Sequence, residues 1–166
     1  NTFNLVLGES ITVFLDKPKV YQEFFRVLKP GGRVADLEMA LLQNLPPPLR
    51  QEMALCYGKN TDPLSFAEWK KALAAAGFQE VEIINPQPLH SNFSLLIAEL
   101  RNDWMLIKDL VQKASSQPAL LPRLQRAANF ARRCQGYFAY GLIYGRKPLS
   151  ATSSFKDSLV RFLLPQ

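Results

Sequence analysis

The sequence predicts an α/β fold with a mostly parallel sheet and helices on both of its faces. Short apolar runs alternate along the chain with stretches whose apolar residues recur at helical spacing. The expected order is strand, helix, strand, insert, helix, strand, two helices and a last strand. In such an order helices connect parallel strands, and the first two crossovers are expected to be right-handed.

The first strand, the first helix and the second strand follow one another closely. Residues 3–7 form a nearly continuous apolar run, which indicates a buried strand. Asp16 and Pro18 mark the start of the helix, because Asp can cap it and proline is tolerated in its first turn. Apolar side chains of this helix share one stripe: Val20, Tyr21, Phe24, Val27 and Leu28. Residues 30–32 (Pro-Gly-Gly) are expected to end the helix, and residues 33–39 to form the second strand.

The next helix has the clearest local signal in the chain. Ser65 and Glu68 have the S-x-x-E spacing of a capping box. Leu64 and Trp69 lie where a hydrophobic staple would form. Gly77 suits the position just after a helix, because glycine readily adopts the left-handed conformation. We therefore expect a helix that begins after Ser65 and ends before Gly77.

The remaining elements are less sharply defined. Residues 41–63 contain a proline run and a short helical pattern, and they are expected to be an insert. Residues 81–84 predict a third strand. Two helices are expected over about 93–113 and 119–133, and residues 137–144 predict the last strand between two glycines.

Composition places the chain among ordinary globular proteins. Of its 166 residues, 48% are hydrophobic and 20% are charged, which suits one domain with a sizeable core. No run of ~18 apolar residues is present for a membrane span, and the start of the sequence has no signal-peptide pattern. The two cysteines form no motif with each other. They indicate a reducing compartment, so we expect a cytoplasmic protein without a metal site.

The net charge is +6, and much of the positive charge lies late in the chain. The basic residues there are Arg123, Arg126, Arg132, Arg133, Arg146 and Lys147. One interpretation is a solvated helix face with a charged strand end. The other is attraction of an anionic ligand or a nucleic acid.

Three stretches of sequence are specific enough to indicate a family. The first, FNLVLGESITVFLDKPKVYQEFFRVLKPGGRVADLEMA, resembles the fourth strand, the following helix and the fifth strand of class I S-adenosylmethionine-dependent methyltransferases. FAEWKKALAAAGFQEVEI resembles the next helix and the sixth strand, and GYFAYGLIYGRKP resembles the last strand. LEMA is similar to the LEF of quinone-biosynthesis members. The resemblance covers residues 3–148 and does not specify a substrate.

The resemblance implies that residues 1–148 are the C-terminal half of a Rossmann-like methyltransferase domain, followed by a tail over 149–166. The four strands would take the family order 4-5-7-6, with the last strand antiparallel. Residues 41–63 and 93–133 would form inserts that shape a lid over a small organic substrate. In this family S-adenosylmethionine is held mainly by a glycine-rich loop of the N-terminal half, and this sequence contains no G-x-G-x-G motif.

The chain is therefore expected to be a fragment that does not methylate on its own. The strand at residues 3–7 would pair with a strand of the missing half, so we expect this apolar edge to pair with that half or with another chain. A small-molecule substrate is favoured, and no membrane partner is expected. Two alternatives stay open: an RNA-modifying methyltransferase, which the positive charge favours, and a non-catalytic binding module with the same fold.

Site residues are expected at the carboxyl ends of the strands, where open α/β sheets bind ligands. By the resemblance, Gly8, Glu9 and Ser10 would line the methionine part of the cofactor. Glu38 and Met39 would lie on the substrate side, with a solvated Glu38 as the alternative.

Two further residues with acid or base chemistry follow from their positions. His90 is the only histidine and comes after the third strand. It is a candidate general base, with a surface position as the alternative, because methyl transfer to a good nucleophile needs mainly positioning. Asp36 lies deeper in its strand than Glu38. A buried carboxylate at that position needs a partner.

Overall fold

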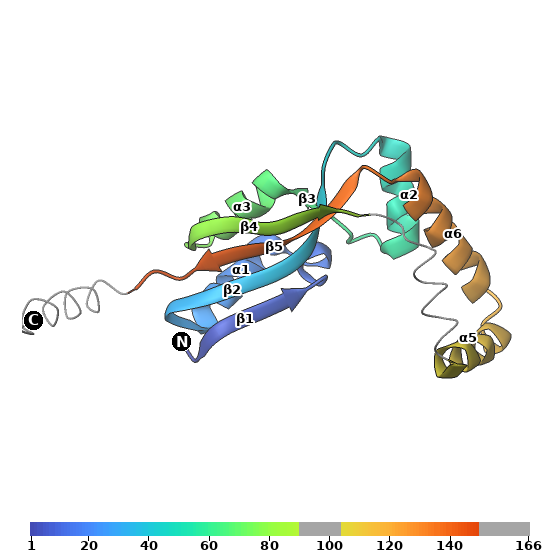
Figure 1. Cartoon of the computed structure of the whole chain (residues 1–166), viewed down its shortest axis with the longest axis horizontal. Coiled ribbons are helices and arrows are strands. Elements are labelled where there is room, and N and C mark those ends of the chain that lie inside the picture. Colours follow the sequence, from blue (N-terminus) through green and yellow to red (C-terminus); the bar gives the residue numbers. More distant parts are fainter. Residues whose placement is uncertain (90–103, 150–166) are drawn as a thin grey trace, which may run out of the picture. The chain divides into compact units, whose positions relative to one another are not determined.

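The computed structural model describes residues 1–89 and 104–149 of the chain (Figure 1). His90, the first part of the expected helix at 93–113 and the tail from residue 150 lie outside the described residues. Among the residues that are described, no helix is both long and apolar enough to cross a lipid bilayer.

The chain divides into two compact units. Among the described residues, the sheet unit comprises Asn1–Ala40, Asp62–Gln87 and residues 140–149. The helical unit comprises Leu41–Thr61, residues 88–89 and residues 104–139. The carboxyl ends of the first two strands and the loop after the first strand belong to the sheet unit.

The strands of the described residues join in one five-stranded sheet. They are β1 (Phe3–Glu9), β2 (Leu28–Leu41), β3 (Leu64–Ser65), β4 (Gln79–Pro88) and β5 (Phe138–Arg146). The order is β1-β2-β5-β4, and the short β3 pairs with β2 off this path. β1 and β2 are parallel, and Figure 1 shows β5 running in the direction opposite to β1. The predicted 4-5-7-6 arrangement with an antiparallel last strand is thus confirmed.

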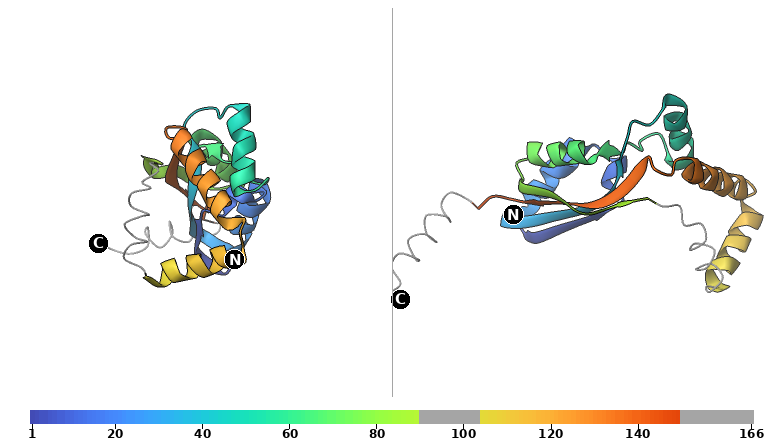
Figure 2. Two further views of the ribbon diagram at one scale, coloured as in Figure 1. Left: turned by 90° about the vertical axis from the view of Figure 1, so that its right-hand side faces the viewer. Right: turned by 45° about the horizontal axis from the view of Figure 1, so that its top comes forward.

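Two helices, α1 (Lys17–Val27) and α3 (Phe66–Ala75), pack against each other and on one face of this sheet (Figure 2). The sequence predicts helices on both faces, whereas the described residues of the sheet unit place both helices on the same face. The reason is the topology. The crossovers from β1 to β2 and from β2 to β4 proceed in the same direction along the sheet. Right-handed crossovers in one direction put their helices on one side.

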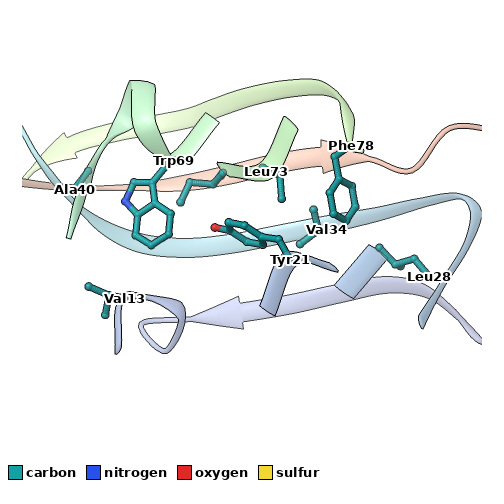
Figure 3. Close-up of a cluster of buried hydrophobic side chains, with 9 residues drawn as sticks. Val13, Tyr21, Leu28, Val34, Ala40, Trp69, Leu73 and Phe78 are labelled. Carbon is teal, nitrogen blue, oxygen red and sulfur yellow. The ribbon is translucent and has the colours of Figure 1, made fainter. Parts of the chain in front are cut away.

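The core fills the space between the two helices and the covered face of the sheet (Figure 3). Its fully buried members include Tyr21, Leu28, Val34, Trp69, Leu73 and Ile143. The Tyr21 ring packs edge-on against Trp69, with ring centroids 6.3 Å apart, and against Phe24 at 6.0 Å. The contact between Tyr21 and Trp69 joins α1 to α3.

Both helices of the sheet unit begin as the sequence predicts. The Asp16 side chain accepts a hydrogen bond from the Lys19 backbone N–H at 3.3 Å. At α3, Ser65 and Glu68 form both hydrogen bonds of the capping box. Gly77 follows the helix with φ at 99°. Because these signals are local, the sequence alone was sufficient to place the starts of both helices and the end of α3.

The connection from α1 to β2 differs from the prediction. The residue after α1, Leu28, already pairs with Phe3 of β1. The next partners are Leu5 and Arg33, so β2 advances from residue 28 to 33 while β1 advances only from 3 to 5. The Lys-Pro-Gly-Gly segment is therefore a bulge inside the strand, with Gly31 at a φ of 78°. Burial of Leu28 in the core holds the chain in the sheet before the bulge.

The helical unit contains α2 (Pro47–Tyr57), α5 (Trp104–Ser116) and α6 (Leu120–Arg133). The bounds of α6 confirm the helix predicted over 119–133. α2 and α6 pack against each other. At their contact Phe130 packs edge-on against Tyr57, with ring centroids 5.9 Å apart.

Candidate functional site

The carboxyl ends of the two parallel strands β1 and β2 lie side by side at one edge of the sheet. Gly8 is paired with Asp36, and Glu9 is paired with Leu37. The register thus brings the predicted cofactor-side segment, residues 8–10, next to the predicted substrate-side segment, residues 38–39. This edge is where open α/β sheets bind ligands.

The loop that leaves β1 has a well-defined backbone. The Ser10 N–H donates to the Leu37 carbonyl at 2.8 Å, and Ser10 has a φ of 52°, which is uncommon for a residue other than glycine. A short 3-10 helix, η1 (Thr12–Phe14), follows. The side chains of Glu9 and Ser10 are exposed. A ligand at this edge can therefore reach a loop whose shape is already fixed.

Glu38 is the residue that fixes this loop. Its side chain is only 1% exposed, and its Oε1 accepts hydrogen bonds from the backbone N–H of Ile11 at 2.9 Å and of Thr12 at 2.6 Å. The alternative of a solvated Glu38 is therefore wrong. The carboxylate is directed at the loop after β1, which makes Glu38 a positioning residue for that loop.

Asp36 has the partner that its burial requires. It is fully buried, and its Oδ2 accepts a hydrogen bond from the Tyr21 hydroxyl at 3.0 Å. Its Oδ1 has no hydrogen-bond partner within the described residues and lies against Gly8. The Thr12 hydroxyl faces the same carboxyl group and lowers its pKa without reaching good hydrogen-bond geometry.

Burial makes this pair of acids reluctant to ionise. Desolvation raises the pKa of Glu38 to about 7, and the nearby charge of Asp36 acts in the same direction. Desolvation also raises the pKa of Asp36. The pKa of Tyr21 is raised as well, by burial and by the negative charge of Asp36. At neutral pH the loop is thus held by a carboxyl group that is close to its own titration point.

The free energy of unfolding is expected to fall as the pH rises from about 5 to about 8. The native state keeps the Glu38 proton up to a pKa of about 7, whereas the unfolded carboxyl group releases it near its ordinary value of 4.5. The unfolded state therefore binds fewer protons in this window, and stability falls with pH. Asp36 contributes in the same direction, because its pKa is also raised.

Urea denaturation at several pH values measures this effect. The loss is expected to be about 3 kcal/mol, which corresponds to a pKa shift of between two and three units. The matched variant is Glu38→Gln, which keeps an acceptor for the loop but cannot ionise, and it should remove most of the decline. A wild-type protein whose stability rises across the window would contradict the assigned direction.

The loop is also held from its other side. The Val13 carbonyl accepts hydrogen bonds from the Lys17 ammonium at 3.1 Å and from the Asp62 N–H at 3.0 Å. Lys17 also forms an ion pair with Asp62 at 3.3 Å and lies 5.8 Å from the centre of the Trp69 ring. Sequence reasoning missed Lys17 and Asp62. The available signal was a lysine in the first turn of a helix, where a positive charge opposes the helix dipole and so suggests a specific role.

Met39 contributes to the hydrophobic core. Its side chain is half-buried and packs against the core cluster, and its carbonyl accepts a hydrogen bond from the Trp69 indole N–H at 3.1 Å. His90 lies outside the described residues, so the structure does not place the candidate base. Within the described residues, no group of three or more His, Cys, Asp or Glu side chains is arranged to hold a metal ion.

Gly8→Ala is expected to lower the free energy of unfolding by about 2 kcal/mol. A Cβ atom at this position would lie 2.1 Å from Oδ1 of Asp36. The carboxyl group cannot move freely, because it is buried and bonded to Tyr21. Chemical denaturation measures the loss, and the cost should shrink in an Asp36→Ala background. An equal cost in both backgrounds would show that the clash is not the cause.

The strand order, the antiparallel last strand and the fixed loop at the carboxyl ends of β1 and β2 define an α/β sheet of the class I S-adenosylmethionine-dependent methyltransferase type. Comparisons with known proteins agree with this class. No family model matches the chain. The uncharacterized methyltransferase YodH of Bacillus subtilis (strain 168) is 36% identical over 92 residues, which cover 55% of this chain and 39% of that protein.

Solved structures show the same fold. Phosphoethanolamine N-methyltransferase 2 of Haemonchus contortus, in complex with S-adenosyl-L-methionine, superposes on 88% of this chain with a TM-score of 0.63 and 16% identity. The cyclopropane synthase MmaA2 of Mycobacterium tuberculosis superposes on 89% with a TM-score of 0.64 and 12% identity. The match covers 33% of the first protein and 56% of the second. The chain thus has the class I methyltransferase fold and spans well under half the length of the curated relative that it matches.

Proposed function

We propose that this chain forms one side of the active site of an S-adenosylmethionine-dependent methyltransferase that acts on a small organic molecule. The observation that carries the proposal is the loop after β1, which Glu38 fixes at the carboxyl ends of the parallel strands. The class I fold and the methyltransferase relative support the same function. When bound, the cofactor supplies an electrophilic methyl group for direct transfer to an oxygen, nitrogen or carbon nucleophile.

The residues of this chain fit one part of the cofactor. Gly8, Glu9 and Ser10 would line its methionine end, because their backbone lies at the edge where the two parallel strands end and the side chains of Glu9 and Ser10 are exposed. The sequence has no glycine-rich loop for the rest of the cofactor. We therefore assign the principal cofactor contacts to a segment that this sequence does not contain.

The same argument gives a partner for β1. In the described sheet β1 is the last strand of the order, and its side chains Phe3, Leu5 and Leu7 are exposed, Leu7 to 73%. An apolar strand at the end of a sheet tends to pair with a further strand. We propose that this edge pairs with an N-terminal half of the domain or with another chain.

We propose that residues 38–39 act on the substrate side indirectly. They would hold in place the loop and the strand end that face the substrate. Glu38 would act by fixing the loop, and Met39 by packing below it. His90 is the candidate base for a nucleophile that has to lose a proton. Methyl transfer to a nucleophile that is already deprotonated needs only positioning in a site that excludes water.

Isothermal titration calorimetry with S-adenosylmethionine and S-adenosylhomocysteine tests this function. The 166-residue chain should bind neither one tightly, and a longer gene product that includes sequence before Asn1 should bind both. Tight binding by the 166-residue chain alone would contradict the assignment of the principal contacts. Absence of binding by the longer product would contradict the methyltransferase function itself.

A further inference from the structure

A basic cavity lies in the helical unit, and the methyltransferase site of the sheet unit does not use it. It has a volume of about 740 Å³, which is within the range of small-molecule sites. Most of its lining comes from one side of α6, where residues recur at helical spacing: Gln125, Arg126, Asn129, Arg132 and Arg133. Pro122 of α6 and Glu52 of α2 complete the lining.

The side chains that line this cavity carry more positive than negative charge. Three guanidinium groups face one carboxylate. Arg133 forms an ion pair with Glu52, and Arg132 donates a hydrogen bond to the Asn129 side chain. Arg126 has no ion pair or hydrogen bond within the part of the chain that the structure describes. The cavity therefore keeps two positive charges that no acidic side chain compensates.

Structural roles account for two of the three arginines only. Arg132 and Arg133 lie in the last turn of α6, where positive charge interacts favourably with the helix dipole. Arg126 lies in the middle of the helix, so the dipole does not explain it. Its guanidinium and that of Arg133 both act to lower the pKa of Cys56 on α2, so both charges lie close to the contact between the two helices.

We propose that this cavity binds the phosphate group of a small phosphomonoester. A guanidinium donates its N–H groups in a fork that matches phosphate oxygens. A phosphomonoester carries a charge of about −1.5 to −2 at neutral pH, which balances the two uncompensated arginines. The side-chain amides of Gln125 and Asn129 offer further polar contacts in the same cavity. Binding of a phosphomonoester in this cavity does not depend on the proposed function.

Calorimetric titration of the 166-residue chain with glycerol 3-phosphate tests the proposal in low salt, with glycerol as the uncharged control. Arg126→Gln should weaken binding by about tenfold or more, the range expected for one charge-assisted hydrogen-bonded contact. The matched control is Arg123→Gln, because Arg123 is exposed on the same helix and does not line the cavity. It should bind as the wild type does. Far-UV circular dichroism checks that both variants keep their helices.

Three results would overturn the proposal. One is the absence of glycerol 3-phosphate binding by the wild type. Another is an equal loss of affinity in the Arg126 and Arg123 variants, which would indicate a diffuse positive surface. The third is much tighter binding of a single-stranded RNA oligonucleotide that weakens steeply with salt and depends on Arg126, which would assign the cavity to a nucleic acid. Because no cofactor is present in this titration, its outcome is independent of the cofactor-binding test.

Discussion

Glu38→Ala should lower the free energy of unfolding by about 3 kcal/mol at a pH of about 5, where the wild-type carboxyl group is protonated. The substitution leaves the N–H groups of Ile11 and Thr12 without their acceptor. The Thr12 group is buried, and a buried donor without a partner costs about 1–3 kcal/mol. The side chain removed is itself buried, so its cavity adds to the loss.

The size of this effect should depend on pH in a defined direction. At a pH of about 8 the wild type has already lost stability, because Glu38 is ionised while buried beside Asp36. Glu38→Ala should therefore cost less at this pH than at the lower one. Glu38→Gln is the matched control and should stay close to the wild type at low pH, since its amide oxygen can accept the same two hydrogen bonds.

Amide hydrogen exchange separates this loop effect from a general loss of stability. In Glu38→Ala the amides of Ile11 and Thr12 should exchange faster than the change in global stability explains. Glu9→Ala removes an exposed carboxylate from the neighbouring strand end and should leave these amides protected. If Glu38→Ala changed stability by less than about 0.5 kcal/mol at low pH, the size of a neutral surface substitution, the positioning role of Glu38 would be wrong.

The parts of the fold that depend on local chemistry could be predicted from the sequence. The capping box at Ser65 and Glu68 fixes the start of α3, and both of its hydrogen bonds are present. The order of the strands could be predicted only through the family resemblance, because β5 inserts between β2 and β4. Local periodicity contains no information on which strands become neighbours.

The sequence did not predict the direction in which the Glu38 side chain points. Its place at the end of a strand suggested contact with a substrate, whereas the structure directs it at the loop after β1. The alternation of side chains along a strand could have predicted that Glu38 is buried. Asp36 and Glu38 have the same parity as Val34 and Ala40, which are buried on the helix-covered face. The partners of Glu38, in contrast, are backbone N–H groups far away in sequence, and no residue pattern identifies them.

The bulge at residues 29–32 has a similar explanation. Proline and glycine correctly predict that the helix ends here, but they do not say whether the chain leaves the sheet. Leu28 keeps the chain in the sheet, because it is fully buried in the core and paired with Phe3. The free energy of burying this side chain is a tertiary effect that outweighs the local preference for a turn.

Trp69→Ala should lower the free energy of unfolding by about 4 kcal/mol, in the upper range for truncation of a buried aromatic residue. The side chain has 0% exposure, and it packs edge-on against Tyr21 of α1. Its loss would also leave the Met39 carbonyl without the indole donor and remove the ring beside Lys17. Trp69 thus connects α3, α1 and the end of β2, the three elements that support the loop of the candidate site.

Trp69→Phe separates packing from hydrogen bonding at this position. The phenyl ring keeps most of the contact with Tyr21 but has no N–H group for Met39, so a loss of about 1–2 kcal/mol is expected. Urea denaturation of the two variants gives the comparison. Because Lys17 holds the Val13 carbonyl of the loop, Trp69→Ala should also increase exchange of the Asp62 amide, which donates to the same carbonyl. If the two variants lost equal stability, the indole hydrogen bond and not the packing of the ring would be the main contribution of Trp69.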